Sequence, residues 1–469
     1  MDKYKIDFED IKTSKYENIA QHIKELVDKN IVKDGEKLPS IRKLANFLKV
    51  NNTTIVNSYK KLEEEGYASQ KVGSGTYAKR KEMSININKK YGKIVSKINL
   101  KGVENYIDFS GEAACSDAFP IDSFKKVINE VLDRDGTKAL VYQEALGYEG
   151  LRNSINKYFW NNKIDVDNIL IVSGAQQGID IVSKSIINVN DNIIIERPSY
   201  GGAIAVFKWR RANIFEVPME KDGMDLDYLE SLVKKNKVKV VYVMSYFQNP
   251  TGITYSLQKK QRLLNMAKIY DFYIIEDDYL SELIYNNDEY VSFKSMDRND
   301  RVIYIKSFSK IFLPGIRLGY MITPNKFREV IQSSKINTDI ATSSLMQRVL
   351  DIYIRKDVWK GYIEKLNSMY KNRYLFIRDN IKYLEKYLDI YIPTGGLHIY
   401  AKIKNSNINC LELFKMLKEQ GILITPGVIF YKKPEEGMRY FRISFSQTDV
   451  EDIEKGFRTI EKILKEWNR

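Results

Sequence analysis

A lysine, two serines and an arginine stand together in SFSKIFLPGIRLG, residues 307–319. This segment follows the apolar run Val302–Ile305, which predicts a buried strand. Lys310 therefore stands at the carboxyl end of a strand, where open α/β sheets bind ligands. A lysine there can form a Schiff base with an aldehyde, and Ser307, Ser309 and Arg317 can bind a phosphate. Pyridoxal 5′-phosphate (PLP) presents both groups, so the segment predicts a PLP site.

Two further motifs supply groups that the PLP ring requires. Asp277 follows the strand-like run Phe272–Ile275, and its carboxylate can pair with the pyridine nitrogen, with the Tyr279 hydroxyl nearby. Asn249, in the motif NPTG, follows the run Val240–Ser245, and its amide can donate to the phenolate oxygen of the ring. Both motifs therefore predict ring contacts at strand ends.

Upstream residues complete the set. The motif SGAQQG, residues 173–178, follows Ile169–Val172 and predicts a helix N-terminus, which suits a phosphate. Tyr200, in ERPSYGG, can stack on the pyridine ring. Each motif is common by itself, but their joint order, each after a buried run, favours one PLP site.

This order resembles the class I aminotransferases of fold type I over residues 106–469. The resemblance implies that Lys310 carries the cofactor, Asp277 faces the pyridine nitrogen, and Tyr200 stacks on the ring. It further implies ring-oxygen contacts from Tyr279 and Asn249, and phosphate contacts from Ala175, Gln176, Ser307 and Arg317. No residue set for a metal is expected.

Two more positions match the same family. Tyr142, in VYQEALGYEGLR, matches a tyrosine that reaches the phosphate of the neighbouring subunit, which implies a homodimer. Arg442, in FRISFS, matches the arginine that clamps a substrate carboxylate, and a guanidinium fork suits that task. Arg442 could equally be a surface residue at a strand edge, and both interpretations stay open at this point.

The elements that must position these residues read as an α/β fold. Several unpunctuated β-branched runs alternate with amphipathic stretches, which indicates strands buried on both faces of a mostly parallel sheet. The runs are Ile169–Val172, Ile193–Ile195, Val238–Met244, Phe272–Ile275 and Val302–Ile305. The resemblance adds a small α+β domain at the carboxyl end, so that a PLP-dependent transferase fold is expected.

The first 80 residues follow another pattern. Apolar spacing predicts helices over Tyr16–Lys29, Ile41–Leu48 and Thr53–Glu65, with Ser40 capping the second and Gly66 ending the third. Residues Ile55, Val56, Tyr59 and Leu62 are predicted to form the core face of the third helix. Two short strands within Tyr67–Tyr77 should follow, joined by a tip at Gly73–Gly75.

The segment LPSIRKLANFLKVNNTTIVNSYKKLEEEGY, followed by VGSGTYAKR, resembles the GntR-type winged helix-turn-helix, here residues 12–80. The third helix should turn its polar side toward the major groove, and the hairpin tip toward a minor groove. The candidate DNA contacts are Ser40, Arg42, Thr53, Thr54, Asn57, Lys60 and Gly75. Asparagines 51 and 52 replace an arginine of many relatives, which favours an operator rich in A·T pairs.

Composition limits the remaining choices. Residues 1–80 hold 16 basic and 12 acidic side chains, and residues 81–101 hold 6 and 1, so positive charge gathers where a polyanion is expected. Residues 81–105 read as a basic linker. Two cysteines and two histidines argue against a disulfide framework, a zinc site or a zinc protease. No membrane span or secretory signal is evident, so a cytoplasmic protein is expected.

A GntR-type head, a basic linker and an aminotransferase body together resemble the MocR/GabR-like regulators. The resemblance implies a transcriptional regulator that binds operator DNA and whose PLP-binding body senses an amino compound or PLP itself. Two alternatives stay open: a working class I aminotransferase with an accessory head, and a DNA-binding repressor independent of PLP.

Overall fold

A computed structural model describes most of the chain. The described residues are 1–6, 14–28, 31–33, 35–64, 67–71, 74–78, 106–111, 113–142, 144–286, 289–312, 314–405 and 407–467. The chain divides into two compact units, Met1–Lys101 and Gly102–Arg469, and each is described by itself. The predicted linker at 81–105, Gly66 and Gly73 lie outside the described residues.

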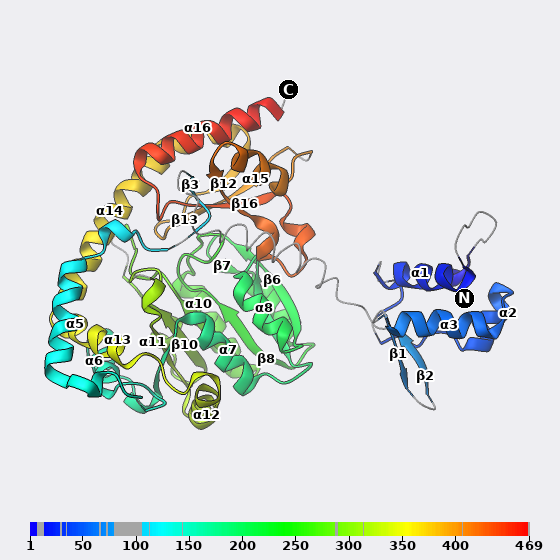
Figure 1. The fold of residues 1–469 in the computed structure, drawn as a ribbon, viewed down its shortest axis with the longest axis horizontal. Coiled ribbons are helices and arrows are strands. Elements are labelled where there is room, and N and C mark those ends of the chain that lie inside the picture. Colours follow the sequence, from blue (N-terminus) through cyan, green and yellow to red (C-terminus); the bar gives the residue numbers. More distant parts are fainter. Residues whose placement is uncertain are drawn as a thin grey trace. The chain divides into compact units, whose positions relative to one another are not determined.

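In its described residues, the amino-terminal unit contains three α-helices and a hairpin, after a short 3-10 helix at Asp2–Tyr4 (Figure 1). Its elements are α1 (Lys15–Asp28), α2 (Ile41–Leu48), α3 (Asn52–Glu64), β1 (Ala68–Lys71) and β2 (Gly75–Ala78), the two strands pairing antiparallel. The Ser40 hydroxyl accepts a hydrogen bond from the Lys43 backbone N–H, so the predicted cap of α2 is confirmed. Helices α1 and α3 each begin one residue earlier than predicted, so Asn52 belongs to α3 rather than to the turn. Their predicted last residues, Lys29 and Glu65, lie outside the described residues.

An eight-stranded sheet forms the centre of the larger unit. Its order is β4 (Ile169–Val172), β11 (Gly319–Ile322), β10 (Val302–Ser307), β9 (Tyr273–Asp278), β8 (Val238–Val243), β5 (Asn192–Arg197), β6 (Asn213–Glu220) and β7 (Gly223–Met224). Only β11 and β7 run against the others, so the prediction of a mostly parallel sheet is confirmed. Strands β4, β9 and β10 are buried along their whole length, as their β-branched runs predict.

Helices cover this sheet, with α7 and α8 side by side on one face (Figure 1). The helices of this region are α5 (Ile121–Asp135), α6 (Glu149–Trp160), α7 (Ala175–Ile186), α8 (Gly201–Trp209), α9 (Leu226–Val233), α10 (Leu257–Ile269), α11 (Phe293–Met296), α12 (Arg328–Asp339) and α13 (Ser344–Arg355). The long helix α14 (Val358–Asn380) leads from this region to the carboxyl-terminal part.

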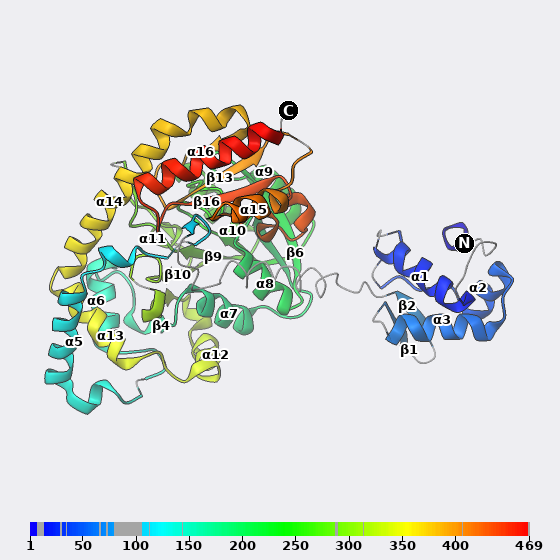
Figure 2. The same ribbon diagram turned by 45° about the horizontal axis from the view of Figure 1, so that its top comes forward.

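The carboxyl-terminal part is a small α+β layer, in which α16 lies beside α14 (Figure 2). Its sheet has the order β12 (Leu388–Tyr391), β13 (His398–Ile403), β16 (Tyr440–Ser444) and β15 (Thr425–Pro426), and its helices are α15 (Cys410–Glu419) and α16 (Val450–Trp467). A separate pair joins β14 (Ile422–Leu423) to β3 (Ile107–Asp108), the first strand of the larger unit. None of the helices in the described ranges is long and apolar enough to cross a membrane.

Candidate cofactor site and nucleic-acid interface

Four adjacent strands deliver the principal predicted cofactor residues to one edge of the sheet. Lys310 follows β10, Asp277 lies near the end of β9, Asn249 follows β8, and Tyr200 follows β5. These strands are parallel neighbours, so their carboxyl ends meet at the same edge. The topology therefore gathers residues that are up to 110 positions apart in the sequence.

The turn that carries Lys310 is anchored by buried apolar side chains. Phe308, Ile311 and Phe312 are nearly inaccessible, and the rings of Phe308 and Phe312 pack against Trp359. The backbone N–H of Phe312 donates to the Phe308 carbonyl at 2.7 Å. These three buried side chains anchor the turn, and Lys310 remains half-buried at the sheet edge.

Asp277 is almost fully buried, and its two carboxylate oxygens differ. Oδ2 accepts a hydrogen bond of 2.6 Å from the hydroxyl of Tyr242, a residue of β8. Oδ1 has no hydrogen-bond partner among the residues that the structure describes. Burial raises the pKa of Asp277 to about 7, against a smaller lowering by the Tyr242 hydrogen bond. A cationic nitrogen at Oδ1 would satisfy this carboxylate, as a pyridinium does.

The raised pKa of Asp277 predicts a pH dependence of stability. Between about pH 4 and pH 7, the folded chain holds a proton that the unfolded chain releases, so the free energy of unfolding falls as pH rises. We expect Asp277→Asn to flatten this dependence in cofactor-free protein, by a few kcal/mol between about pH 5 and pH 8. Urea unfolding at both pH values measures it, and parallel profiles for parent and variant would contradict it.

A glycine turn between β4 and α7 forms the candidate phosphate cradle. Gly174 caps α7 with φ +96° and ψ 168°, a conformation that residues with a Cβ rarely adopt. A Cβ added there would lie 3.1 Å from Arg317 Nη2 and 3.4 Å from Ser309 Oγ. Arg317 also donates to the Ser173 carbonyl at 2.5 Å. The helix N-terminus, an arginine and a serine hydroxyl thus converge, as phosphate binding requires.

Polar residues of α7 and α12 support this turn. Gln177 accepts from the Ser173 backbone N–H at 2.7 Å and donates to Asp339 at 2.6 Å. Asp339 is in turn paired with Lys335, which is fully buried. The sequence motifs gave no sign of Asp339 or Lys335, because a local pattern cannot show which helix covers a turn.

Replacement of Gly174 by alanine should disturb the cradle in two ways. The unfavourable backbone conformation should lower the free energy of unfolding by about 1–3 kcal/mol. Displacement of Arg317 should weaken PLP binding by about tenfold, which titration of cofactor-free protein measures. The matched control is Gly361→Ala in α14, where a Cβ would meet no described atom within 4 Å. Equal PLP affinity in parent and Gly174→Ala would contradict the cradle.

The other predicted cofactor residues differ in their contacts and in their exposure. Gln176 and Tyr200 both lie against Gly202, and Gln176 Oε1 and Ser309 Oγ have no hydrogen-bond partner among the described residues. The Tyr279 hydroxyl donates to the Phe247 carbonyl at 2.6 Å. Tyr142 is 79% exposed.

Arg442 is not a surface residue, so that interpretation was wrong. It lies in β16, is 7% exposed, and its Nη1 donates to Asn249 Oδ1 at 2.8 Å. Its guanidinium also lies over the Phe430 ring. The carboxylate candidate and a predicted ring contact are therefore directly bonded, which places Arg442 beside the cofactor residues.

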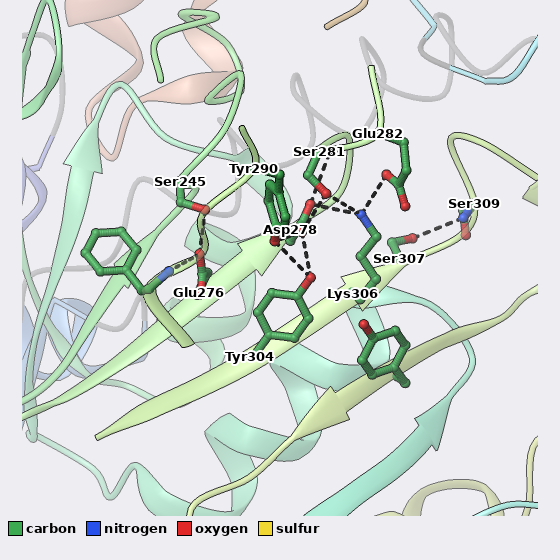
Figure 3. A network of polar contacts seen from close by, with 12 residues as sticks. Ser245, Glu276, Asp278, Ser281, Glu282, Tyr290, Tyr304, Lys306, Ser307 and Ser309 are labelled. Atoms are coloured by element: carbon green, nitrogen blue, oxygen red, sulfur yellow. Dashed lines mark hydrogen bonds and ion pairs between the residues drawn. The ribbon is translucent and has the colours of Figure 1, made fainter. Parts of the chain in front are cut away.

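Asp278, the residue after Asp277, belongs to a separate charged cluster (Figure 3). The Lys306 ammonium donates to Asp278 at 3.0 Å and to Glu282 at 2.7 Å, and the Tyr304 hydroxyl donates to Asp278 at 2.6 Å. Burial lowers the pKa of Lys306, but the two carboxylates raise it above its usual value. Lys306 is therefore held as a cation on Asp278, which makes it a poor competitor of Lys310 for the cofactor aldehyde.

The polar face of α3 is exposed, as DNA recognition requires. Thr53, Asn57 and Lys60 are exposed on this face and Thr54 is half-buried. Arg42 at the start of α2 and Gly75 at the hairpin are exposed too. Val56 was predicted to lie in the core, but this prediction was wrong, because its side chain is 42% exposed. Ile55 and Ser58, on the opposite side of α3, are the residues that are buried.

Comparison with known proteins identifies the larger unit. Residues 108–460 match the family model for aminotransferases of classes I and II. The chain belongs to this family. Residues 15–78 match the model for bacterial regulatory proteins of the gntR family. A GntR-type head fused to an aminotransferase body is the architecture of the MocR/GabR-like regulators, so the predicted resemblance is confirmed.

Individual relatives fall into two groups. The aromatic-amino-acid aminotransferase 1 of Thermococcus litoralis is 28% identical, covering 79% of this chain and 90% of its own length. The uncharacterized HTH-type transcriptional regulator YdfD of Bacillus subtilis is also 28% identical, over 97% of both chains. The kynurenine aminotransferase of Pyrococcus horikoshii, solved with PMP, has a TM-score of 0.75 at 26% identity, covering 81% of this chain and 95% of that one. The aminotransferase family thus contributes the body, and regulators share the whole architecture.

PLP dependence is a property of this family, and the residues present fit the cofactor. The buried Oδ1 of Asp277, the buried Oγ of Ser309 and the glycine cradle at 174 each offer an atom or a space that PLP would fill. When bound, PLP supplies the electron sink of amino-group chemistry. This chain's own groups would hold the phosphate, stabilise a charged ring nitrogen and receive a carboxylate.

Proposed function

We propose that this protein is a PLP-dependent transcriptional regulator, in which residues 12–80 bind operator DNA and residues 106–469 bind PLP and sense an amino compound. One observation carries the proposal: a GntR-type unit, whose predicted recognition helix has an exposed polar face, shares a chain with an aminotransferase body that holds the predicted cofactor residues. The basic segment 81–105 would connect them. A DNA-binding regulator acts where the chromosome is, which favours the cytoplasm.

In the cofactor site, we assign the covalent attachment to Lys310 and the pyridine nitrogen contact to Asp277. Tyr200 would stack on the ring, with Asn249 and Tyr279 near its oxygen. The phosphate would be bound by Ala175, Gln176, Ser307, Ser309 and Arg317. Arg442 would bind the carboxylate of the amino compound, since its buried guanidinium already lies beside Asn249.

A homodimer is part of the proposal. Tyr142 is 79% exposed, and the neighbouring Leu140 and Val141 are 66% and 57% exposed. Exposed apolar side chains around a tyrosine that would reach a partner's phosphate support a twofold interface. Sedimentation of the PLP-loaded protein tests this, and a monomer with full cofactor at micromolar concentration would contradict it.

The function itself is tested by DNA selection from a random pool with PLP-loaded full-length protein. Enrichment of one sequence, bound much more tightly than random DNA, is the expected result. Failure to enrich any sequence would reject the regulator.

A catalytic aminotransferase is the second candidate, because the body holds the predicted cofactor residues and Arg442 is buried beside one of them, Asn249. Turnover of amino acids with a keto-acid acceptor, followed over many cycles per protein, separates the two functions. Steady multiple turnover without sequence-specific DNA binding would favour the enzyme.

A further inference from the structure

The segment that opens the aminotransferase body is bonded directly to the candidate carboxylate residue. Arg442 Nη2 donates to the Ser110 carbonyl at 2.8 Å, and the Thr425 hydroxyl donates to the same oxygen at 2.9 Å. Nη1 of Arg442 is engaged with Asn249. One guanidinium therefore holds both a candidate ring contact and the backbone of Ser110.

Ser110 belongs to a segment, Ile107–Gly111, that is tied into the fold at several points. The Asp108 carboxylate accepts from the Ser110 backbone N–H at 2.8 Å and from its hydroxyl at 2.6 Å. Strand β3 pairs with β14, and the Ser444 backbone N–H donates to the Phe109 carbonyl. A shift of the Ser110 carbonyl would thus move a braced segment rather than one peptide group.

This segment is also the end of the body that continues toward the DNA-binding unit. In the sequence it follows residues 79–105 directly, and these follow the GntR-type residues 15–78. Ile107–Gly111 is therefore the part of the body that lies nearest to the head in the sequence among the described residues.

A bound carboxylate would compete with Ser110 for Arg442. Hydrogen bonds to a charged acceptor are roughly twice as strong as those to a neutral one, and a carboxylate takes two parallel guanidinium donors. The two nearest acceptors of Arg442, the Ser110 carbonyl and Asn249 Oδ1, are neutral. The Ser110 carbonyl can release Arg442 because the Thr425 hydroxyl still donates to it.

We propose that the Ser110 carbonyl is the contact through which a carboxylate-bearing amino compound, bound at Arg442, changes the DNA affinity of the head. Asp108 and Thr425 are then positioning residues that set the place of this carbonyl. The inference rests on the proposed function and deepens it, since it names the contact that links effector binding to DNA affinity. An effector must bind the two arrangements of the segment with different affinity for this coupling to exist.

The test compares operator affinity of PLP-loaded full-length protein with and without each proteinogenic L-amino acid, used as probes at saturation. The ratio of the two affinities is the coupling factor, which should be about 5-fold or more in the parent. Asp108→Ala removes the acceptor for Ser110, and Thr425→Val removes the donor to its carbonyl. Asp108→Asn and Thr425→Ser keep those groups and are the matched controls.

We expect Asp108→Ala and Thr425→Val to bring the coupling factor below about 2-fold, while both controls stay near the parent value. Hydrogen exchange in a peptide covering residues 107–111 should change on adding the amino acid to the parent but not to Asp108→Ala. Coupling that persists in both disruptive variants would overturn the inference and leave the proposed function intact. Loss in all four variants would show a merely structural role and would also overturn it. A parent that binds operator without any amino-acid effect would reject the proposed sensing function itself, and the inference with it.

Discussion

Lys310→Ala should abolish covalent retention of PLP. In the parent protein, borohydride treatment should fix the cofactor to the chain, and peptide mass mapping should find it on Lys310. The variant should retain none, because Lys310 is the half-buried lysine that the SFSK turn holds at the edge where Asp277, Asn249 and Tyr200 converge. Noncovalent PLP can still bind through the phosphate cradle, so binding should weaken rather than vanish.

Two controls make this result specific. Lys326→Ala changes an exposed lysine and should leave the trapped cofactor unchanged. Lys306 lies four residues from Lys310, but its ammonium is bonded to Asp278 and Glu282. A trapped cofactor that persists in Lys310→Ala, mapped to Lys306 or elsewhere, would refute the assignment.

The second large effect concerns DNA. Asn57→Ala should cost about 1–3 kcal/mol on the selected operator and little on random DNA, because an exposed asparagine on α3 can pair with an adenine edge. Lys60→Ala should instead weaken binding to all DNA alike and reduce the slope of log affinity against log salt by about one unit, since it neutralises a phosphate.

Fluorescence anisotropy over a series of salt concentrations measures both effects, and PLP absorbance should not change in either variant. Glu63→Ala, at an exposed position of the same helix, controls for altered helix stability. Parent-like operator binding by both Asn57→Ala and Lys60→Ala would contradict the prediction that α3 contacts DNA.

Local patterns predicted much of the fold and the elements that deliver the site. Unbroken β-branched runs revealed the buried strands, and the Ser40 cap and α2 were predicted to the residue. The positions of Lys310, Asp277 and Asn249 at strand ends followed from the same runs. These features depend on neighbours in sequence, so periodicity and capping rules capture them.

The supporting residues could not be predicted, because they depend on which distant elements pack together. Tyr242 reads as one more residue of an apolar run, yet its hydroxyl defines which oxygen of Asp277 remains available. Val56 follows the apolar spacing of α3, but only Ile55, Tyr59 and Leu62 of the predicted core face are buried. The burial of Arg442 depends on contacts with Asn249 and Ser110, which are far from it in the sequence.

Reciprocal linkage tests the central claim most directly. The operator affinity of PLP-loaded protein should change when an amino acid that binds the cofactor site is added, and the affinity for that amino acid should change by the same factor when operator is added. Equal factors in the two titrations are the predicted result. If an amino acid alters the PLP absorbance of the protein while operator affinity stays constant, the body is not a sensor for the head, and the account is contradicted.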